Sequence, residues 1–391
     1  MTIAAGVAAA AALGKVAPVS DAVRGAFALS ATGLGLVIST ITFVAALFAL
    51  PVGEWLRHRA VGTWVAGGLA VLAVAGCLMV AVAPGGGVLV GLRVAEGAGY
   101  LLVVVGGPVV LVSQVPERRL APALAVWGAC IPAGLALSAV AGGLAGSAWG
   151  WRGWFLLLAA VCAVLAAVAG ATAGTSRTPS PPGSPGRRVT AGPLLLGAGF
   201  ALIALINVAV LSLFPLYLGS RFGLPPVTAG ALTSAVAVAS VPGSLLAGAL
   251  LRRGVAPRVV GSAALSCPVS AALTFGGALP PAATVVTAAL LVFASGIGVG
   301  AAYGALPSVV ARPDALPAAN GVLVQLGSAG TLLAPPLFAA VTGLERWERV
   351  AFLILPAAAA GPALLACATA RRPRDAGHPG HAETTEEKGN R

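Results

Sequence analysis

The sequence has very little charge. Only 9% of its 391 residues are Asp, Glu, Lys or Arg, against about 25% in an ordinary soluble domain. Hydrophobic residues make up 58% of the chain, and the mean hydropathy is +0.98. A soluble fold of this length needs far more charged side chains to cover its surface. The composition excludes a soluble enzyme, a coiled coil and a disordered chain, and it predicts an all-α integral membrane protein.

Residue types that build catalytic and metal sites are scarce as well. The sequence has three histidines and five cysteines, with no Cys-x-x-Cys pair, no His-Glu-x-x-His motif and no phosphate-binding P-loop. We therefore expect no enzyme activity, no metal site and no cofactor. A metal role for His378 and His381 is less favoured than an ordinary solvated tail. The 23 Lys and Arg residues stand mostly singly or in pairs between apolar runs, which argues against a nucleic-acid partner.

Long uncharged stretches predict twelve membrane-spanning helices. A span needs about 20 apolar residues. A turn at 84–87 separates the third helix from a fourth that starts near Val88, and Pro280 with Pro281 divides the longest stretch in two. The stretches are 2–19 (broken only by Lys15), 25–53, 60–92, 97–116, 120–151, 153–176, 189–220, 222–251, 259–311, 315–344 and 350–370.

The basic residues are distributed unequally between the two sides of the membrane. Along the predicted topology, 16 Lys and Arg fall in one set of loops and termini and 5 in the other, and the richer side faces the cytoplasm. Both termini are therefore expected in the cytoplasm, in a multi-pass protein of the cell's inner (plasma) membrane. The predicted organisation is an N-terminal six-helix half at 1–173, a cytoplasmic linker at 174–192, a C-terminal six-helix half at 193–370 and a disordered cytoplasmic tail at 371–391.

The two halves repeat one another. Gly53, before a basic pair at the end of the second helix, has a counterpart in Gly248, 195 residues later, and Pro108 has one in Pro307, 199 residues later. Offsets that stay between 195 and 199 residues indicate a duplication in which both halves share one orientation. Parallel six-helix repeats about an axis along the membrane normal are the architecture of one large class of transporters.

The chain resembles the major facilitator superfamily over nearly its full length, and three local motifs support the resemblance. Gly91–Gly99, with an Arg followed by Glu-Gly-Ala-Gly, is similar to the family's helix-four motif. Gly150–Phe155 is similar to the family's Gly-Trp-Arg-x-x-Phe entry to helix six, and Gly53–Arg59 stands where the family has Gly-x-x-x-Asp-Arg-x-Gly-Arg-Arg. Within the family, Lys15 before Val-Ala-Pro and the Glu96–Tyr100 stretch are similar to cyanate-permease-like members.

The resemblance implies two halves that rock about a central cavity lined by helices one, four, seven and ten. It also implies gating residues at the cytoplasmic ends of helices two and eight. The family's acidic position is Arg57 in the first half and Arg252 in the second. Glu54 is an alternative acid in the first half, and none is available in the second. The implied gating residues are Gly53, Arg57, Gly248 and Arg252.

Three charged residues fall inside the predicted spans: Lys15, Arg93 and Glu96. A charge at the bilayer centre costs roughly 2.5–3.5 kcal/mol, so it is expected to face a partner or a watery cavity. Lys15 is predicted to lie about 7 Å below the outer end of the first helix, and Arg93 and Glu96 about 8–12 Å below the outer end of the fourth. Arg93, Glu96, Gly97 and Tyr100 share one helical face, on which Arg93 and Glu96 can pair.

This cluster allows two interpretations. In the functional one it faces the cavity, Glu96 carries the coupling proton beside Arg93, and the cations bind substrate. In the other, Lys15 snorkels to the outer interface, and Arg93 and Glu96 form a structural ion pair. For Asn207, an interhelical hydrogen bond is the alternative to ligand contact. The predicted substrate-binding residues are Lys15, Arg93, Tyr100, Asn207, Tyr217, Tyr303 and Gln325.

These features predict a secondary active transporter of a small solute, working by alternating access and coupled to protons. A small anion is the favoured substrate, because the three intramembrane charges sum to +1 with Glu96 ionised and to +2 with it protonated. A proton-driven exporter of drugs or lipophilic metabolites is the main alternative. A channel and a membrane-embedded sensor or enzyme are alternatives of other classes. The expected partners are a small-molecule substrate, protons and the lipid bilayer, and a monomer is expected.

Overall fold

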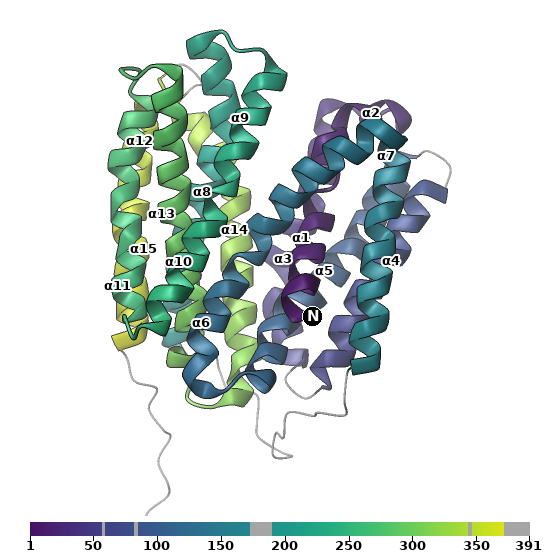
Figure 1. The fold of residues 1–391 in the computed structure, drawn as a ribbon, viewed down its shortest axis with the longest axis vertical. Helices are drawn as coiled ribbons and strands as arrows, with labels where there is room; N and C mark the ends of the chain where they lie inside the picture. The colour runs from purple at the N-terminus through teal and green to yellow at the C-terminus, as the bar shows by residue number, and fades with distance from the viewer. Residues whose placement is uncertain (57–58, 82–84, 173–189, 343–345, 371–391) are drawn as a thin grey trace, which may run out of the picture.

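The computed structural model describes residues 1–56, 59–81, 85–172, 190–342 and 346–370. In these residues every regular element is a helix (Figure 1). The first half contains α1 (Thr2–Gly14), η1 (Ala17–Val19), α2 (Ser20–Ala26), α3 (Ala31–Leu56), α4 (Val61–Ala81), α5 (Gly86–Gln114), α6 (Glu117–Gly128) and α7 (Cys130–Thr172). The second half contains α8 (Ala191–Phe222), α9 (Pro226–Val238), α10 (Ser240–Arg252), α11 (Pro257–Gly261), η2 (Ser262–Ser266), α12 (Cys267–Phe275), α13 (Pro281–Ala305), η3 (Leu306–Val309), η4 (Pro313–Ala315), α14 (Leu316–Thr342) and α15 (Arg349–Ala370).

The twelve predicted spans are confirmed. In the described residues, 11 helical segments are long and apolar enough to cross a membrane, and the longest, Glu117–Thr172, has 56 residues. This segment turns at Gly150, whose φ of 69° and ψ of 175° are not helical. A positive φ strains residues that have a Cβ, so a glycine suits the turn. The fifth and sixth spans therefore lie on either side of Gly150.

The first span differs from the prediction. It covers Thr2–Ala26 rather than 2–19, and it is broken in the middle. The helix α1 ends at Gly14, a 3-10 turn carries Pro18, and α2 completes the span. Pro18 has no N–H to donate to the carbonyl of Gly14, so a continuous α-helix cannot form there. Lys15 therefore lies near the middle of its span, deeper than predicted.

Other boundaries lie close to the predicted ones. The fourth span begins at Gly86, and α8 begins at Ala191, inside the predicted linker. Arg57, linker residues 174–189 and the tail at 371–391 lie outside the described residues.

The two halves lie side by side, α1–α7 in one and α8–α15 in the other (Figure 1). Because each half has six spans, α7 ends, α8 begins and α15 ends on the same side of the bundle, which we call the linker end. The ribbons of the two halves approach one another near the linker end, around α6 and α14, and diverge toward the opposite end, where α9 and α2 are separated (Figure 1).

Glycines allow close packing between the halves at the linker end. A Cβ added at Gly53 of α3 would lie 2.5 Å from the carbonyl oxygen of Pro317, at the start of α14. One added at Gly321 of α14 would lie 2.6 Å from the carbonyl oxygen of Ala49. The backbones of α3 and α14 are therefore nearly in contact where both helices reach the linker end.

One hydrophobic cluster joins the two halves through α6 and α13. It includes Leu124 and Trp127 from α6 and Ala302 and Tyr303 from α13. Each half also has a core of its own. The linker end is thus closed by apolar contacts as well as by helix backbones.

Candidate functional site

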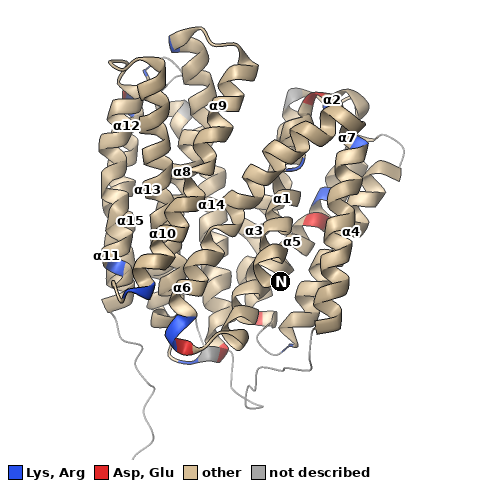
Figure 2. Ribbon diagram, in the orientation of Figure 1, with Lys and Arg blue, Asp and Glu red and all other residues tan. Residues whose placement is uncertain are grey.

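Most charged residues lie near the two ends of the bundle (Figure 2). Lys15, Arg93 and Glu96 are exceptions, with exposed fractions of 2%, 0% and 0%. Charged side chains are almost never fully buried unless they are paired. These three contact one another inside the N-terminal half, and we call them the buried triad.

Arg93 joins three helices of the N-terminal half. Its Nη1 donates to the carboxylate Oε2 of Glu96 at 2.8 Å and to the carbonyl of Ala12 at 3.1 Å. Its Nη2 donates to the carbonyl of Leu13 at 3.0 Å, and its Nε donates to the carbonyl of Val37 in α3 at 3.0 Å. The guanidinium therefore binds the last carbonyls of α1, where the helix dipole favours a cation.

The side chain of Lys15 reaches the other oxygen of the same carboxylate. Its Nζ donates to Oε1 of Glu96 and lies 4.4 Å from the centre of the Phe155 ring. Its carbonyl, at the break in the first span, accepts a hydrogen bond of 3.0 Å from Nε1 of Trp154. The contact with Glu96 and the burial of Lys15 support pairing rather than snorkelling to the outer interface.

Glu96 is the centre of the triad, because each of its carboxylate oxygens accepts from a different cation. With all three groups charged, the triad carries a net charge of +1. Within the described residues, no three His, Cys, Asp or Glu side chains are grouped as a metal site would require. The arrangement can hold a proton, or a small anion opposite its two cations, if the contacts to Glu96 are exchanged.

The predicted substrate residues of the C-terminal half do not join this cluster. Asn207 of α8 donates from Nδ2 to Oγ of Ser295 in α13 at 2.7 Å, which is the interhelical bond that the sequence allowed. Tyr217 is 1% exposed, and its ring centre lies 5.1 Å from that of Phe275 and 5.5 Å from that of Trp347. Both residues link helices of one half.

Two further predicted residues lie between the halves. Tyr303 packs against Phe200 with ring centres 5.5 Å apart, and its ring lies 3.2 Å from where a Cβ of Gly128 in α6 would be. Gln325 of α14 accepts on Oε1 from the backbone N–H of Leu50 in α3 at 2.8 Å. Tyr100, one turn beyond Glu96 on α5, is buried with 5% exposed.

The predicted gating residues divide into packed glycines and arginines at helix ends. A Cβ on Gly248 of α10 would lie 3.2 Å from the carbonyl oxygen of Pro122 in α6. Gly53 and Gly248 thus occupy matching places, each against the opposite half. Arg252, the last residue of α10, is exposed.

Sequence reasoning missed three side chains that this region depends on. Trp154 and Phe155 support Lys15, and both belong to the Gly-Trp-Arg-x-x-Phe motif, which indicates a family but not a site. Asn320 of α14 is fully buried and donates to two carbonyls of α5. The sequence feature that indicates this contact is Pro108, which removes the helical partner of one of those carbonyls.

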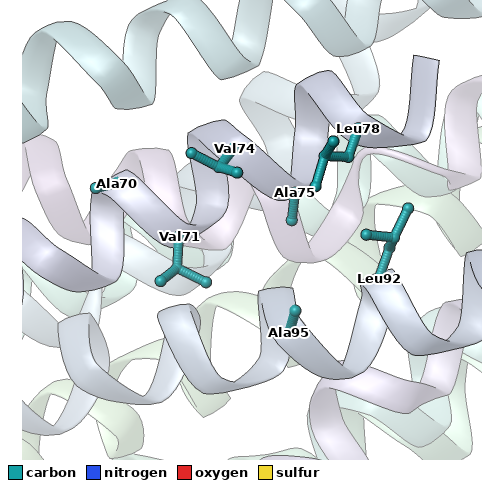
Figure 3. Close-up of a pocket in the computed structure, with 7 residues that line it drawn as sticks. All are labelled: Ala70, Val71, Val74, Ala75, Leu78, Leu92 and Ala95. Atoms are coloured by element: carbon teal, nitrogen blue, oxygen red, sulfur yellow. The ribbon is translucent and has the colours of Figure 1, made fainter. Parts of the chain in front are cut away.

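A shallow apolar groove of about 270 Å³ runs between α4 and α5 (Figure 3). Val71 and Val74 on its wall are 37% and 58% exposed on the outer surface of the bundle. The groove offers no polar side chain to orient a charged solute, so we do not assign transport to it. Its lining residues are Ala70, Val71, Val74, Ala75, Leu78, Leu92 and Ala95.

Comparison with known proteins adds a family and a fold. The family model described as Major Facilitator Superfamily matches residues 2–313. The fold is similar to the crystal structure of the human organic anion transporter MFSD10 (TETRAN), with a TM-score of 0.75 and 15% sequence identity over 93% of this chain and 97% of that one. No curated protein matches the sequence.

Proposed function

This chain belongs to the major facilitator superfamily, and we propose that it carries a small organic or inorganic anion across the membrane together with protons. The family consists of secondary transporters and not of enzymes, so the open questions are the solute and the coupling. The buried triad is the observation that supports the proposal. Ionisable side chains buried within a membrane are costly and rare, and the net charge of this triad is positive.

The sign of the triad favours an anion. Two cations and one carboxylate sit in a region of low dielectric, where charges interact far more strongly than in water. An anion that reaches Lys15 and Arg93 gains from both cations, whereas a cation gains only from Glu96 and is repelled by the other two. MFSD10 is described as an organic anion transporter, which is the same class, but a likeness at 15% identity concerns the fold and the proposal does not rest on it.

Glu96 supplies the coupling. A proton on Glu96 removes the negative partner that both Lys15 and Arg93 contact, and it leaves a net charge of +2 in the triad. An anion then takes the place of the carboxylate as their partner. Proton binding and anion binding at this site therefore favour one another, and the linkage is reciprocal. The two ligands move together in this scheme.

The conformation of the two halves fits a carrier. We assign the linker end to the cytoplasm, because the basic residues concentrate there along the chain. The closed linker end and the divergent opposite end then correspond to an outward-facing state. The broken first span, held by Arg93 and Trp154, resembles the discontinuous helices that build transporter sites.

The first experiment identifies the solute class. Purified protein is screened by thermal shift against a panel of small carboxylates, inorganic anions and organic cations at two pH values. Anions should raise the melting temperature, and more strongly at the lower pH. Stabilisation by organic cations alone would contradict the anion proposal and favour the drug exporter.

The second experiment tests the coupling in proteoliposomes. Glu96→Gln should abolish uptake driven by a pH gradient but retain exchange of labelled anion for unlabelled anion, because the neutral amide mimics a protonated carboxyl. Glu117→Gln at the exposed start of α6 is the matched control and should retain both. Gradient-driven uptake at the wild-type rate in Glu96→Gln would remove Glu96 from the coupling.

A further inference from the structure

Two amide side chains of α14 cross from the C-terminal half to the backbone of the N-terminal half. Asn320 is fully buried, and its Nδ2 donates to the carbonyls of Val104 at 3.1 Å and Val105 at 3.0 Å, both in α5. Gln325, five residues further along α14, binds the backbone N–H of Leu50 in α3. None of these three bonds joins residues of the same half.

Pro108 explains why Asn320 is needed. In an α-helix the carbonyl of residue i accepts from the N–H of residue i+4. The carbonyl of Val104 would accept from position 108, which is a proline inside α5 and has no N–H. A buried carbonyl without a partner is costly. The amide of Asn320 supplies the missing donor from the other half.

Gln325 meets α3 in a similar place. Its partner Leu50 directly precedes Pro51, a proline inside α3. A proline within a helix removes one backbone bond and its ring displaces the carbonyl four residues before it. Both crossings therefore reach the N-terminal half within one turn of a proline, and at Val104 the proline is the reason that the carbonyl has no helical donor.

These bonds lie in the part of the structure that must separate when the linker end opens. Asn320 lies three residues from Pro317 and one from Gly321, both of which pack against the backbone of α3. The bonds can exist only while α14 is held against α3 and α5. Water entering the opened linker end can then bind the released amide and carbonyl groups.

We propose that Asn320 and Gln325 form a latch that holds the linker end shut. The latch consists of hydrogen bonds from side chain to backbone, so opening exchanges them for bonds to water and the cost stays small. The net free energy of one such hydrogen bond, after exchange with bonds to water, shifts an equilibrium by about two- to twelvefold. Loss of the Asn320 contacts should thus raise the ratio of linker-end-open to linker-end-closed protein about tenfold.

The test measures the distance between spin labels in full-length protein in lipid nanodiscs. Labels on cysteines introduced at Arg118 of α6 and Arg253 beside α10, in a variant without the native cysteines, report on the linker end. Asn320→Leu and, as a second variant, Gln325→Leu should each add a population with longer distances. Ser244→Ala is the control, because Ser244 is fully buried and donates to the carbonyl of Gly296 at 2.9 Å within one half.

Pro108→Ala gives the latch a sharper test. An alanine at 108 restores an N–H for the carbonyl of Val104, so Asn320→Leu should shift the equilibrium less in that background than in wild type. Two results would overturn the latch: unchanged distances in both Asn320→Leu and Gln325→Leu, or a shift in Ser244→Ala as large as theirs. An effect of Asn320→Leu that is equal with and without Pro108 would overturn the role given to the proline.

Discussion

Replacing Arg93 should destabilise the N-terminal half as well as weaken solute binding. The guanidinium makes four hydrogen bonds that join α1, α3 and Glu96. Interhelical bonds in membranes average about 0.6 kcal/mol and reach about 1.7, so the three to the carbonyls of Ala12, Leu13 and Val37 contribute roughly 2–5 kcal/mol. Removing one partner of a buried ion pair costs about 3–5 kcal/mol. The overlap of the two ranges gives about 3–5 kcal/mol for Arg93→Gln, and we take about 3 because Lys15 still pairs with Glu96.

That loss corresponds to a melting temperature lower by roughly 6–12 °C, at about 2–4 °C per kcal/mol. Arg93→Lys should lose about half as much, because an ammonium keeps the charge but lacks the planar fork that holds two carbonyls and a carboxylate together. Arg24→Gln is the matched control, since exposed Arg24 donates to the carbonyl of Leu29 at 3.2 Å, a local bond five residues away. The assay is thermal unfolding of each purified variant.

The same variants separate the two solute classes. The affinity for an anion should fall strongly in Arg93→Gln. It should fall only partly in Arg93→Lys, because a lysine supplies charge without the bidentate geometry. A melting temperature of Arg93→Gln within about 2 °C of wild type would refute the claim that Arg93 stabilises the end of α1. Unchanged anion affinity in that variant would refute Arg93 as a binding group.

Two further predictions concern the linker end. Gly53→Val should stop transport, since its Cβ would lie 2.5 Å from the carbonyl oxygen of Pro317, whereas Gly67→Val, with nothing within 4 Å of its Cβ, should transport normally in the same uptake assay. If both variants transport alike, the close approach has no part in closure. In intact cells, a cysteine at Arg118 should stay unlabelled by a membrane-impermeant thiol reagent while one at Arg24 is labelled, and the opposite pattern would invert the proposed orientation.

The fold could be predicted because it follows from composition and repetition. A helix is the only structure that satisfies its own backbone in lipid, so uncharged stretches of sufficient length give the spans directly. The break in the first span was missed, although Pro18 was visible in the sequence. Its position matters, because it places Lys15 in the middle of the span, where burial requires a partner.

The site could be predicted only in part. Arg93 and Glu96 are three residues apart on one helix, so local geometry was sufficient to predict that they pair. The contact of Lys15 with Glu96 joins residues 81 positions apart and depends on how α1 packs against α5. Predicting the contact of Asn320 requires both Pro108 and the knowledge that α14 packs against α5. That packing is tertiary structure, which no local sequence pattern indicates.

The most direct test of the account is proton uptake on anion binding. Purified protein in weakly buffered detergent solution, with a pH-sensitive dye, is mixed with an anion found by the thermal-shift panel. The account predicts that wild-type protein takes up protons as the anion binds, and that Glu96→Gln binds the anion without taking any up. Anion binding with no proton uptake in wild type, or equal uptake in Glu96→Gln, would contradict coupling at the buried triad.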